Sequence, residues 1–382
     1  MQEDISTTHS SVINQIIALL DQYGRINSRE FAVVTSSRIY IRDKDRVPRN
    51  KDNLKVYIER NNIAEVHIGK FNYFKNQEES NSFILGYSMK ELVFDIDLTD
   101  IDYDKIYDLQ GSNKLVIRKC CYGKKFCSKC WIHIKANVLI LEYFMSQLGI
   151  DKKDMLWVFS GSKGVHLIIN SKKSMLLNDL QRKNIYNMIE MFGDPTKTIE
   201  MANKLIGFPS KIMNEHIMDI YLILEKIIQH IVNKKGLRFL NRDSSFMGVL
   251  NSICLGYPDQ ILEIIEKSYS EKNQWNFMKQ SFNVIAYTDK PNPLILSMFR
   301  YFYPILDKNV TLCMSHLIKC PFSINTNSGC LSLPLTRDQI MDMDDRYLIK
   351  CESLKGPWNH LTQEQNVIIN NSINIMNLWL KK

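Results

Sequence analysis

The chain has 382 residues, of which 45% are apolar and 24% are charged, and it carries a formal net charge of +8. These values are typical of a soluble globular protein with room for more than one subdomain. No apolar run approaches the ~18 residues of a membrane span, and the acidic start at Met1–Asp4 differs from a signal peptide. We therefore expect an intracellular protein without a membrane partner. The positive charge is compatible with a polyanionic partner but does not establish one.

The first seventy or so residues predict a helix, three strands, and a charged loop at 43–53 that a short helix could follow. Ser10 and Ser11 can cap a helix that ends near Gly24. Two strands of a hairpin are expected at 29–34 and 39–42, and a further strand at 64–69 that is stopped by its glycine. Charged residues at strand ends, such as Glu30 and Arg42, are usually solvated, so neither indicates a function by itself.

The next strand carries two carboxylates. An apolar run from Glu91 leads into Asp95-Ile96-Asp97, and residues two apart in a strand point to the same face. Two like charges held that close repel each other, so a site that keeps both usually binds cations. Oxygen ligands favour Mg²⁺ or Mn²⁺, whose common partner is a phosphate. The alternative is an ordinary turn or helix cap.

Cysteines are unevenly distributed. Four of the nine fall within eleven residues, in a basic segment, as Cys120, Cys121, Cys127 and Cys130. This spacing predicts a structural Zn²⁺ site in an element at 118–133, which either only clips the chain or also touches nucleic-acid backbone. Adjacent cysteines crowd each other, so His133 could replace one of them. The other five are expected to be small buried residues: Cys254, Cys313, Cys320, Cys330 and Cys351.

A helix and a hairpin follow the cysteines. Residues 131–148 predict an amphipathic helix, and residues 156–170 predict two strands joined by a glycine-containing loop. The glycines allow a tight turn whose N–H groups face an anion, and three side chains add donors. The loop therefore predicts a phosphate site, although a plain hairpin is the alternative. Its residues are Ser160, Gly161, Ser162, Lys163, Gly164, Val165 and His166.

The rest of the chain is largely helical. Residues 172–300 have helical periodicity without a catalytic cluster, which favours an inserted subdomain used for packing and partner contact. Asp307 follows an apolar run and could be a third metal-binding carboxylate, with Lys319 as a charge on a triphosphate tail. An edge strand is expected at 331–334, and a last amphipathic helix at 364–380.

The order of these motifs resembles the small, catalytic subunit of eukaryotic and archaeal DNA primases. The strand at 91–97, the cysteine pair followed by Cys-x-x-Cys-Trp, and Ser-Gly-x-x-Gly-Val-His at 160–166 are similar to that family's core strand, zinc motif and nucleotide loop. The runs at 306–310 and 316–323 resemble its third motif. Order and intervals agree from about residue 20 to 335, whereas the helical insert agrees only in position and character.

The resemblance implies an α+β fold. Its parts are a primase-type catalytic core at 1–171 and 301–382, with a mixed or antiparallel sheet flanked by helices, the zinc element, and a helical subdomain inserted at 172–300. It also implies that Asp95, Asp97 and Asp307 bind two Mg²⁺ or Mn²⁺ ions and that Glu30 belongs to the catalytic residues. The implied nucleotide-binding residues are Arg42, Ser160, Gly161, Ser162, Lys163, Gly164, Val165, His166, His316, Lys319 and Asn325.

By the same resemblance the protein synthesises short RNA primers from ribonucleoside triphosphates on single-stranded DNA. Its partners would be that template, the RNA primer, a large primase subunit in a heterodimer and, in eukaryotes, the DNA polymerase alpha complex. A nuclear location follows only from the eukaryotic character of the match. The alternatives are a self-sufficient primase-polymerase that uses deoxynucleotides, or a catalytically silent zinc-containing scaffold that binds nucleic acid.

Three positions depart from the family pattern. Ser162-Lys163 replaces two arginines, which removes one bidentate phosphate donor and predicts weaker triphosphate binding. The family's Lys-x-Asp-Ile-Gly is here Glu65-Val66-His67-Ile68-Gly69, so the charges are inverted where the family recognises the ribose. Asn325 replaces a histidine at the triphosphate and carries no charge.

Overall fold

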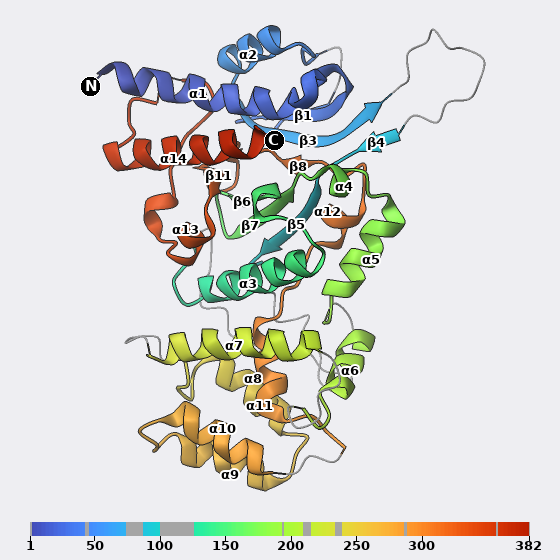
Figure 1. Cartoon of the computed structure of the whole chain (residues 1–382). Helices are drawn as coiled ribbons and strands as arrows, with labels where there is room; N and C mark the ends of the chain where they lie inside the picture. Colours follow the sequence, from blue (N-terminus) through green and yellow to red (C-terminus); the bar gives the residue numbers. More distant parts are fainter. Residues whose placement is uncertain are drawn as a thin grey trace, which may run out of the picture.

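The computed structural model describes residues 2–42, 46–73, 87–99, 126–192, 195–208, 215–233, 239–285, 289–356 and 358–381. Within these residues the chain forms an α+β fold in which every strand pairing is antiparallel (Figure 1). The α+β prediction is therefore confirmed, with antiparallel rather than mixed pairing in this part of the chain. No described helix has the length and apolarity needed to cross a membrane.

The first sheet has the strand order β2-β1-β3-β4, with β8 also pairing β3. The predicted hairpin is confirmed, because Val33 of β1 pairs with Ile41 of β2. The prediction that Gly69 stops β3 is wrong. A Cβ at Gly69 would lie 2.3 Å from Leu317 Cδ2, so the glycine serves a close approach between segments inside a longer strand. The strands are β1 (Arg29–Thr35), β2 (Tyr40–Ile41), β3 (Ile63–Tyr73), β4 (Tyr87–Met89) and β8 (Ile318–Lys319).

The second sheet contains both predicted site motifs and has the order β11-β6-β7-β5. The Asp-x-Asp strand pairs with the strand that follows the glycine loop, so that Asp95 lies opposite His166 and Asp97 opposite Gly164. The edge strand predicted at 331–334 is confirmed in part, because the strand begins only at Leu333, where Pro334 pairs with Val158, and Leu331 belongs to another strand. The strands are β5 (Leu92–Asp97), β6 (Met155–Phe159), β7 (Gly164–Ile169) and β11 (Leu333–Leu335), and a separate pair is formed by β9 (Ile324–Asn325) and β10 (Cys330–Leu331).

Two terminal helices lie side by side over the sheets (Figure 1). Gln15 of the first donates to Asn377 of the last at 3.0 Å. The prediction that Ser10 and Ser11 cap the first helix is wrong, because the helix begins earlier and both serines lie inside it. Packing against the last helix stabilises turns that the capping pattern did not include. These helices are α1 (Gln2–Leu20) and α14 (Gln363–Leu380), and α2 (Lys51–Arg60) lies near them.

The central helix α3 (Trp131–Gln147) lies between the second sheet and the helices below it (Figure 1). Its predicted range is confirmed, but the amphipathic prediction is wrong, because both of its sides are buried. Trp131 donates to Ile340 O at 2.9 Å on one side, and His133 packs against Tyr301 on the other, with ring centroids 4.5 Å apart. A helix covered on both sides lacks a polar face.

Between residues 172 and 300 the described elements are α-helices joined by turns and loops, as the helical periodicity predicted, with one isolated β-bridge between Ile206 and Pro291. A helical subdomain with boundaries at 172 and 300 stays a prediction. Four of the five scattered cysteines are buried as predicted, whereas Cys313 is exposed. The helices are α4 (Lys172–Met175), α5 (Asp179–Ile189), α6 (Pro195–Lys204), α7 (Glu215–Asn233), α8 (Ser245–Cys254), α9 (Asp259–Ser268), α10 (Gln274–Val284) and α11 (Pro293–Phe302), followed by α12 (Lys308–Leu312) and α13 (Arg337–Met341).

A buried ion pair connects the beginnings of β1 and β5, which belong to different sheets. The Arg29 guanidinium donates both of its terminal nitrogens to the Glu91 carboxylate at 3.1 and 2.9 Å, and the two side chains are 0% and 2% exposed. The adjacent Lys90 donates to Cys313 O at 2.9 Å, and Arg182 donates to the carbonyls of Lys90 and Glu91. These bonds fix the segment that leads into Asp95.

Replacing Glu91 by glutamine should lower the free energy of unfolding by about 3 kcal/mol, because it leaves the Arg29 charge buried without a counter-charge. Denaturant unfolding followed by circular dichroism measures this change. The matched control is Arg242→Gln, which breaks an ion pair whose side chains are 66% and 60% exposed and should cost less than about 1 kcal/mol. Equal effects of the two substitutions would contradict a structural role of the Arg29–Glu91 pair.

Candidate active site

A cavity of about 250 Å³ is lined by the three predicted metal-binding carboxylates and by several of the predicted nucleotide-binding residues. It lies where β5 and β7 of the second sheet meet β8 of the first sheet and the start of α12. The lining residues are Val93, Asp95, Asp97, Ser160, His166, Asp307, Val310, His316, Leu317, Ile318, Lys319 and Asn325. The structure therefore brings Asp307 together with Asp95 and Asp97, which lie more than two hundred positions earlier in the chain.

Each carboxylate reaches the cavity from a defined backbone position. Asp95 and Asp97 alternate with buried residues along β5, as the strand pattern predicts. Asp307 caps α12 by accepting from the Asn309 N–H at 2.8 Å, and its own N–H donates to Asp95 O at 3.4 Å. Thr311 anchors the same helix to β5 by donating to Val93 O at 2.9 Å. Asp307 is thereby attached directly to the strand that carries the other two.

Each carboxylate also has a protein neighbour on one oxygen. Asp97 Oδ1 accepts from the N–H and the hydroxyl of Thr99 at 2.8 and 2.9 Å, and Asp95 Oδ1 lies 3.3 Å from His166 Nε2. In the part of the chain that the structure describes, no three His, Cys, Asp or Glu side chains are gathered tightly enough to enclose an ion. The donor set itself, three carboxylates on one cavity, is the kind that Mg²⁺ and Mn²⁺ bind.

His166 and Lys319 are two of the nitrogen-containing side chains that line the same cavity, and burial shifts the pKa of each. Burial, followed by the charges of Lys319 and His67, lowers the pKa of His166 to about 4, so its ring is neutral at neutral pH. Burial also lowers the pKa of Lys319, but the carboxylates of Glu65 and Asp95 oppose that shift. The cavity thus combines three acids, the Lys319 ammonium and two imidazoles, of which the neutral His166 ring can accept or donate a hydrogen bond.

Glu65 supports Lys319 from inside the first sheet. Its Oε1 lies 3.1 Å from Lys319 Nζ and accepts from the Thr326 N–H at 2.8 Å, while Oε2 lies 2.6 Å from His67 Nε2. Burial would raise the pKa of Glu65, but the His67 bond, the Lys319 charge and the Thr326 bonds outweigh it and lower the pKa to about 2. Sequence reasoning did not assign Glu65 a role, although an acid within an apolar strand was a usable signal.

The glycine loop differs in part from the predicted phosphate site. The N–H groups of Ser162 and Gly164 donate to Ser160 Oγ at 3.4 and 3.2 Å, inside the loop. Gly164 also allows β7 to approach β5, since a Cβ there would lie 2.5 Å from Ile96 O. Of the loop residues, Ser160 and His166 line the cavity, whereas Gly161, Ser162, Lys163, Gly164 and Val165 do not.

Two other predicted site residues, Glu30 and Arg42, lie away from the cavity lining. Glu30 accepts from Arg42 at 3.2 Å and from Asn72 at 3.3 Å, and the Arg42 side chain is 50% exposed. His316 and Asn325 do line the cavity. Cys120 and Cys121 lie outside the described residues.

Cys127 and Cys130 lie close together, so both could bind one metal ion. Their Sγ atoms lie 3.5 Å apart, close to the ~3.8 Å that separates two thiolates bound at ~2.3 Å to a tetrahedral Zn²⁺. His133, the other candidate ligand, packs in the core against Tyr301 and Phe302. Burial lowers its pKa to about 4. This packing favours thiolates over His133 as the remaining ligands.

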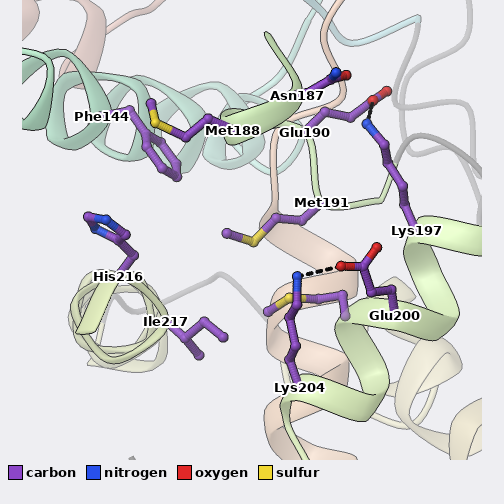
Figure 2. A pocket seen from close by; sticks show the side chains of 11 residues that line it. Phe144, Asn187, Met188, Glu190, Met191, Lys197, Glu200, Lys204, His216 and Ile217 are labelled. Atoms are coloured by element: carbon purple, nitrogen blue, oxygen red, sulfur yellow. Dashed lines mark hydrogen bonds and ion pairs between the residues drawn. The ribbon is translucent and has the colours of Figure 1, made fainter. Parts of the chain in front are cut away.

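A second cavity, of about 260 Å³, lies between α3, α5, α6 and α7 (Figure 2). Phe144, Met188 and Met191 extend toward its interior. Its two acids are both ion-paired, Glu190 with Lys197 and Glu200 with Lys204, and these pairs are drawn as dashed lines. Because its lining does not combine converging carboxylates with β-strand ends, we place the candidate active site in the first cavity.

Comparison with known proteins identifies the family. The family model described as DNA primase small subunit matches residues 94–337, which include all three carboxylates. This chain belongs to the DNA primase small-subunit family. The DNA primase small subunit of Saccharomyces cerevisiae is 26% identical over 328 residues, covering 81% of this chain and 73% of the yeast protein.

Further primase small subunits are similar over comparable lengths. That of Caenorhabditis elegans is 24% identical over 363 residues, covering 90% of this chain and 81% of the nematode protein. The archaeal PriS protein of Methanosphaerula palustris is 24% identical over 268 residues, covering 68% of this chain and 61% of its own length. Both eukaryotic and archaeal primase small subunits are thus relatives, and the family supports a primase role in DNA replication.

Proposed function

We propose that this primase small subunit is catalytic and makes short RNA primers on single-stranded DNA from ribonucleoside triphosphates. The observation that carries the proposal is the convergence of Asp95, Asp97 and Asp307 on one cavity with Lys319 and His166. Three carboxylates that share one space repel one another, so their retention favours a cationic ligand. Two Mg²⁺ or Mn²⁺ ions fit that donor set.

The proposed chemistry is nucleotidyl transfer. Metal ions bound by the three carboxylates would lower the pKa of the attacking 3′-hydroxyl and stabilise charge at the α-phosphate and the leaving pyrophosphate. Lys319, oriented by Glu65, supplies a positive charge for the phosphate tail. Ser160, His166, His316 and Asn325 provide hydrogen-bonding groups around the same space. Glu30 and Arg42 would join from the neighbouring hairpin once a nucleotide extends beyond the cavity.

The partners follow from the family. A primase small subunit is expected to work as a heterodimer with a large subunit and, in eukaryotes, with the DNA polymerase alpha complex in the nucleus. A Zn²⁺ bound by Cys120, Cys121, Cys127 and Cys130 would fix the segment that leads into α3, whose residue Trp131 follows Cys130 directly. These assignments of partners, location and zinc ligands go beyond membership of the family and are proposals for this chain.

Replacing Asp95, Asp97 or Asp307 by asparagine should reduce primer synthesis by at least about a thousandfold, because each change removes one negative oxygen ligand from a metal site. The measurement is product formation on oligo(dT) with ATP and Mn²⁺, with the large subunit present. Asp338→Asn is the matched control, because its exposed carboxylate lies outside the cavity. A normal rate for a double Asp95→Asn, Asp97→Asn variant would exclude these residues from catalysis.

The same assay separates the alternative functions. RNA products with ATP support a primase, whereas DNA products with dATP support a self-sufficient primase-polymerase. His67 stands where the family has an acid, and its ring is hydrogen-bonded to Glu65. This replacement is the feature that favours the second possibility. Absence of both products with the wild-type chain and a large subunit would support a silent scaffold and overturn the proposal.

Replacing Cys127 and Cys130 by serine should remove the bound zinc and destabilise the fold, because structural zinc contributes directly to folding free energy. Elemental analysis of the purified protein gives the metal content, and thermal unfolding gives the stability. Cys254→Ser is the control for loss of a buried thiol. A wild-type protein that contains no zinc, or a double variant that retains it, would contradict the assignment.

A further inference from the structure

The turn at 325–329, which joins β9 to β10, is hydrogen-bonded to the glycine loop. Asn325 Nδ2 donates to Ser160 O at 3.2 Å, and Ser328 Oγ donates to Gly161 O at 2.6 Å. A Cβ at Gly161 would lie 2.6 Å from Cys330 O, so the two segments are in close contact. Two successive carbonyl groups of the loop therefore point to this turn.

The direction of those carbonyls determines the direction of the loop amides. In a trans peptide the C=O and the N–H of one unit point to opposite sides. Bonding the carbonyls of Ser160 and Gly161 to the turn therefore directs the N–H groups of Gly161 and Ser162 away from it. In agreement, Ser162 N lies 3.4 Å from the hydroxyl of Ser160, a residue that lines the cavity.

Gly161 cannot keep this orientation by itself. Its φ is +79°, a region that glycine enters freely, so Gly161 itself adds little restraint on the orientation of the peptide that follows it. A rotation of this peptide would move the Gly161 carbonyl oxygen away from the turn and toward the side where the Ser162 N–H now lies. Carbonyl oxygens repel anions, whereas amides attract them. A contact from outside the loop is therefore needed to hold the Gly161–Ser162 peptide in one orientation.

We propose that Ser328 is a positioning residue that holds the Gly161 carbonyl toward the turn at 325–329 and thereby keeps the glycine loop in the conformation that binds phosphate. The inference rests on the proposed function for its ligand, a nucleoside triphosphate. Ser328 does not line the cavity and acts only through the loop.

The surroundings of Ser328 favour this direction of bonding. The Cys330 N–H lies 3.1 Å from Ser328 Oγ and donates to it, which leaves the hydroxyl proton for Gly161 O. Thr326 is fixed on both sides, because its N–H donates to Glu65 at 2.8 Å and its carbonyl accepts from Arg38 at 3.2 Å. The turn is thus anchored to the first sheet and can restrain the loop of the second.

The experiment measures binding of inorganic tripolyphosphate to the full chain by isothermal titration calorimetry. Ser328→Ala should weaken binding roughly fivefold, the value of one lost hydrogen bond, and Ser328→Thr should restore it. The control is Ser252→Ala, which removes a half-buried hydroxyl bonded at 2.8 Å to Gly248 O, far along the chain in α8. Ser252→Ala should leave the dissociation constant unchanged.

A kinetic measurement separates positioning from general destabilisation. In primer synthesis, Ser328→Ala should raise the KM for the triphosphate by the same factor while kcat changes less than about twofold. Unchanged tripolyphosphate binding in Ser328→Ala, equal losses in Ser328→Ala and Ser252→Ala, or a wild-type chain that binds no tripolyphosphate would overturn the inference. A wild-type chain that binds it but makes no primers would instead overturn the proposed function and leave the Ser328 inference intact.

Discussion

The antiparallel register between β5 and β7 is the constraint on which the site depends. It sets Asp95 opposite His166 and Asp97 opposite Gly164. A shift of one residue would turn both aspartates to the opposite face of the sheet and bury them. Gly164 makes the register possible, because any larger residue would collide with the backbone of Ile96. The same strand binds α12, so that Asp307 follows wherever β5 is placed.

A second requirement is that charges be balanced both in the cavity and in the protein interior beneath it. The outer layer contains the three aspartates of the cavity, for which divalent cations are the proposed partners. The inner layer contains the ion pairs Arg29–Glu91 and Lys319–Glu65, whose acids are nearly inaccessible to solvent. At such depth a charge without its partner costs several kcal/mol. The Arg29–Glu91 pair therefore fixes the segment that leads into Asp95, and the Lys319–Glu65 pair places an ammonium group on the same cavity, so both pairs connect the stability of the fold to the geometry of the site.

Local patterns predicted what depends on neighbouring residues. The alternation at Asp95 and Asp97, the hairpin at 155–169 and the terminal helix follow from apolar periodicity, and the motif order indicated the family that the comparison confirmed. Contacts between distant segments were not predictable. The two-sided burial of α3, the early start of α1, and the bonds from the turn at 325–329 to the glycine loop all depend on packing between elements far apart in sequence. The exposure of Cys313 was not predictable either, because it depends on where α12 ends.

The central claim, that Asp95, Asp97 and Asp307 jointly bind the catalytic metal ions, is tested most directly by anomalous diffraction. A crystal soaked with Mn²⁺ and a nonhydrolysable nucleoside triphosphate is measured at the manganese absorption edge. The account predicts two anomalous peaks about 4 Å apart, each within ~2.3 Å of a carboxylate oxygen of these three residues. Fully occupied nucleotide with no manganese peak beside the three carboxylates would contradict it.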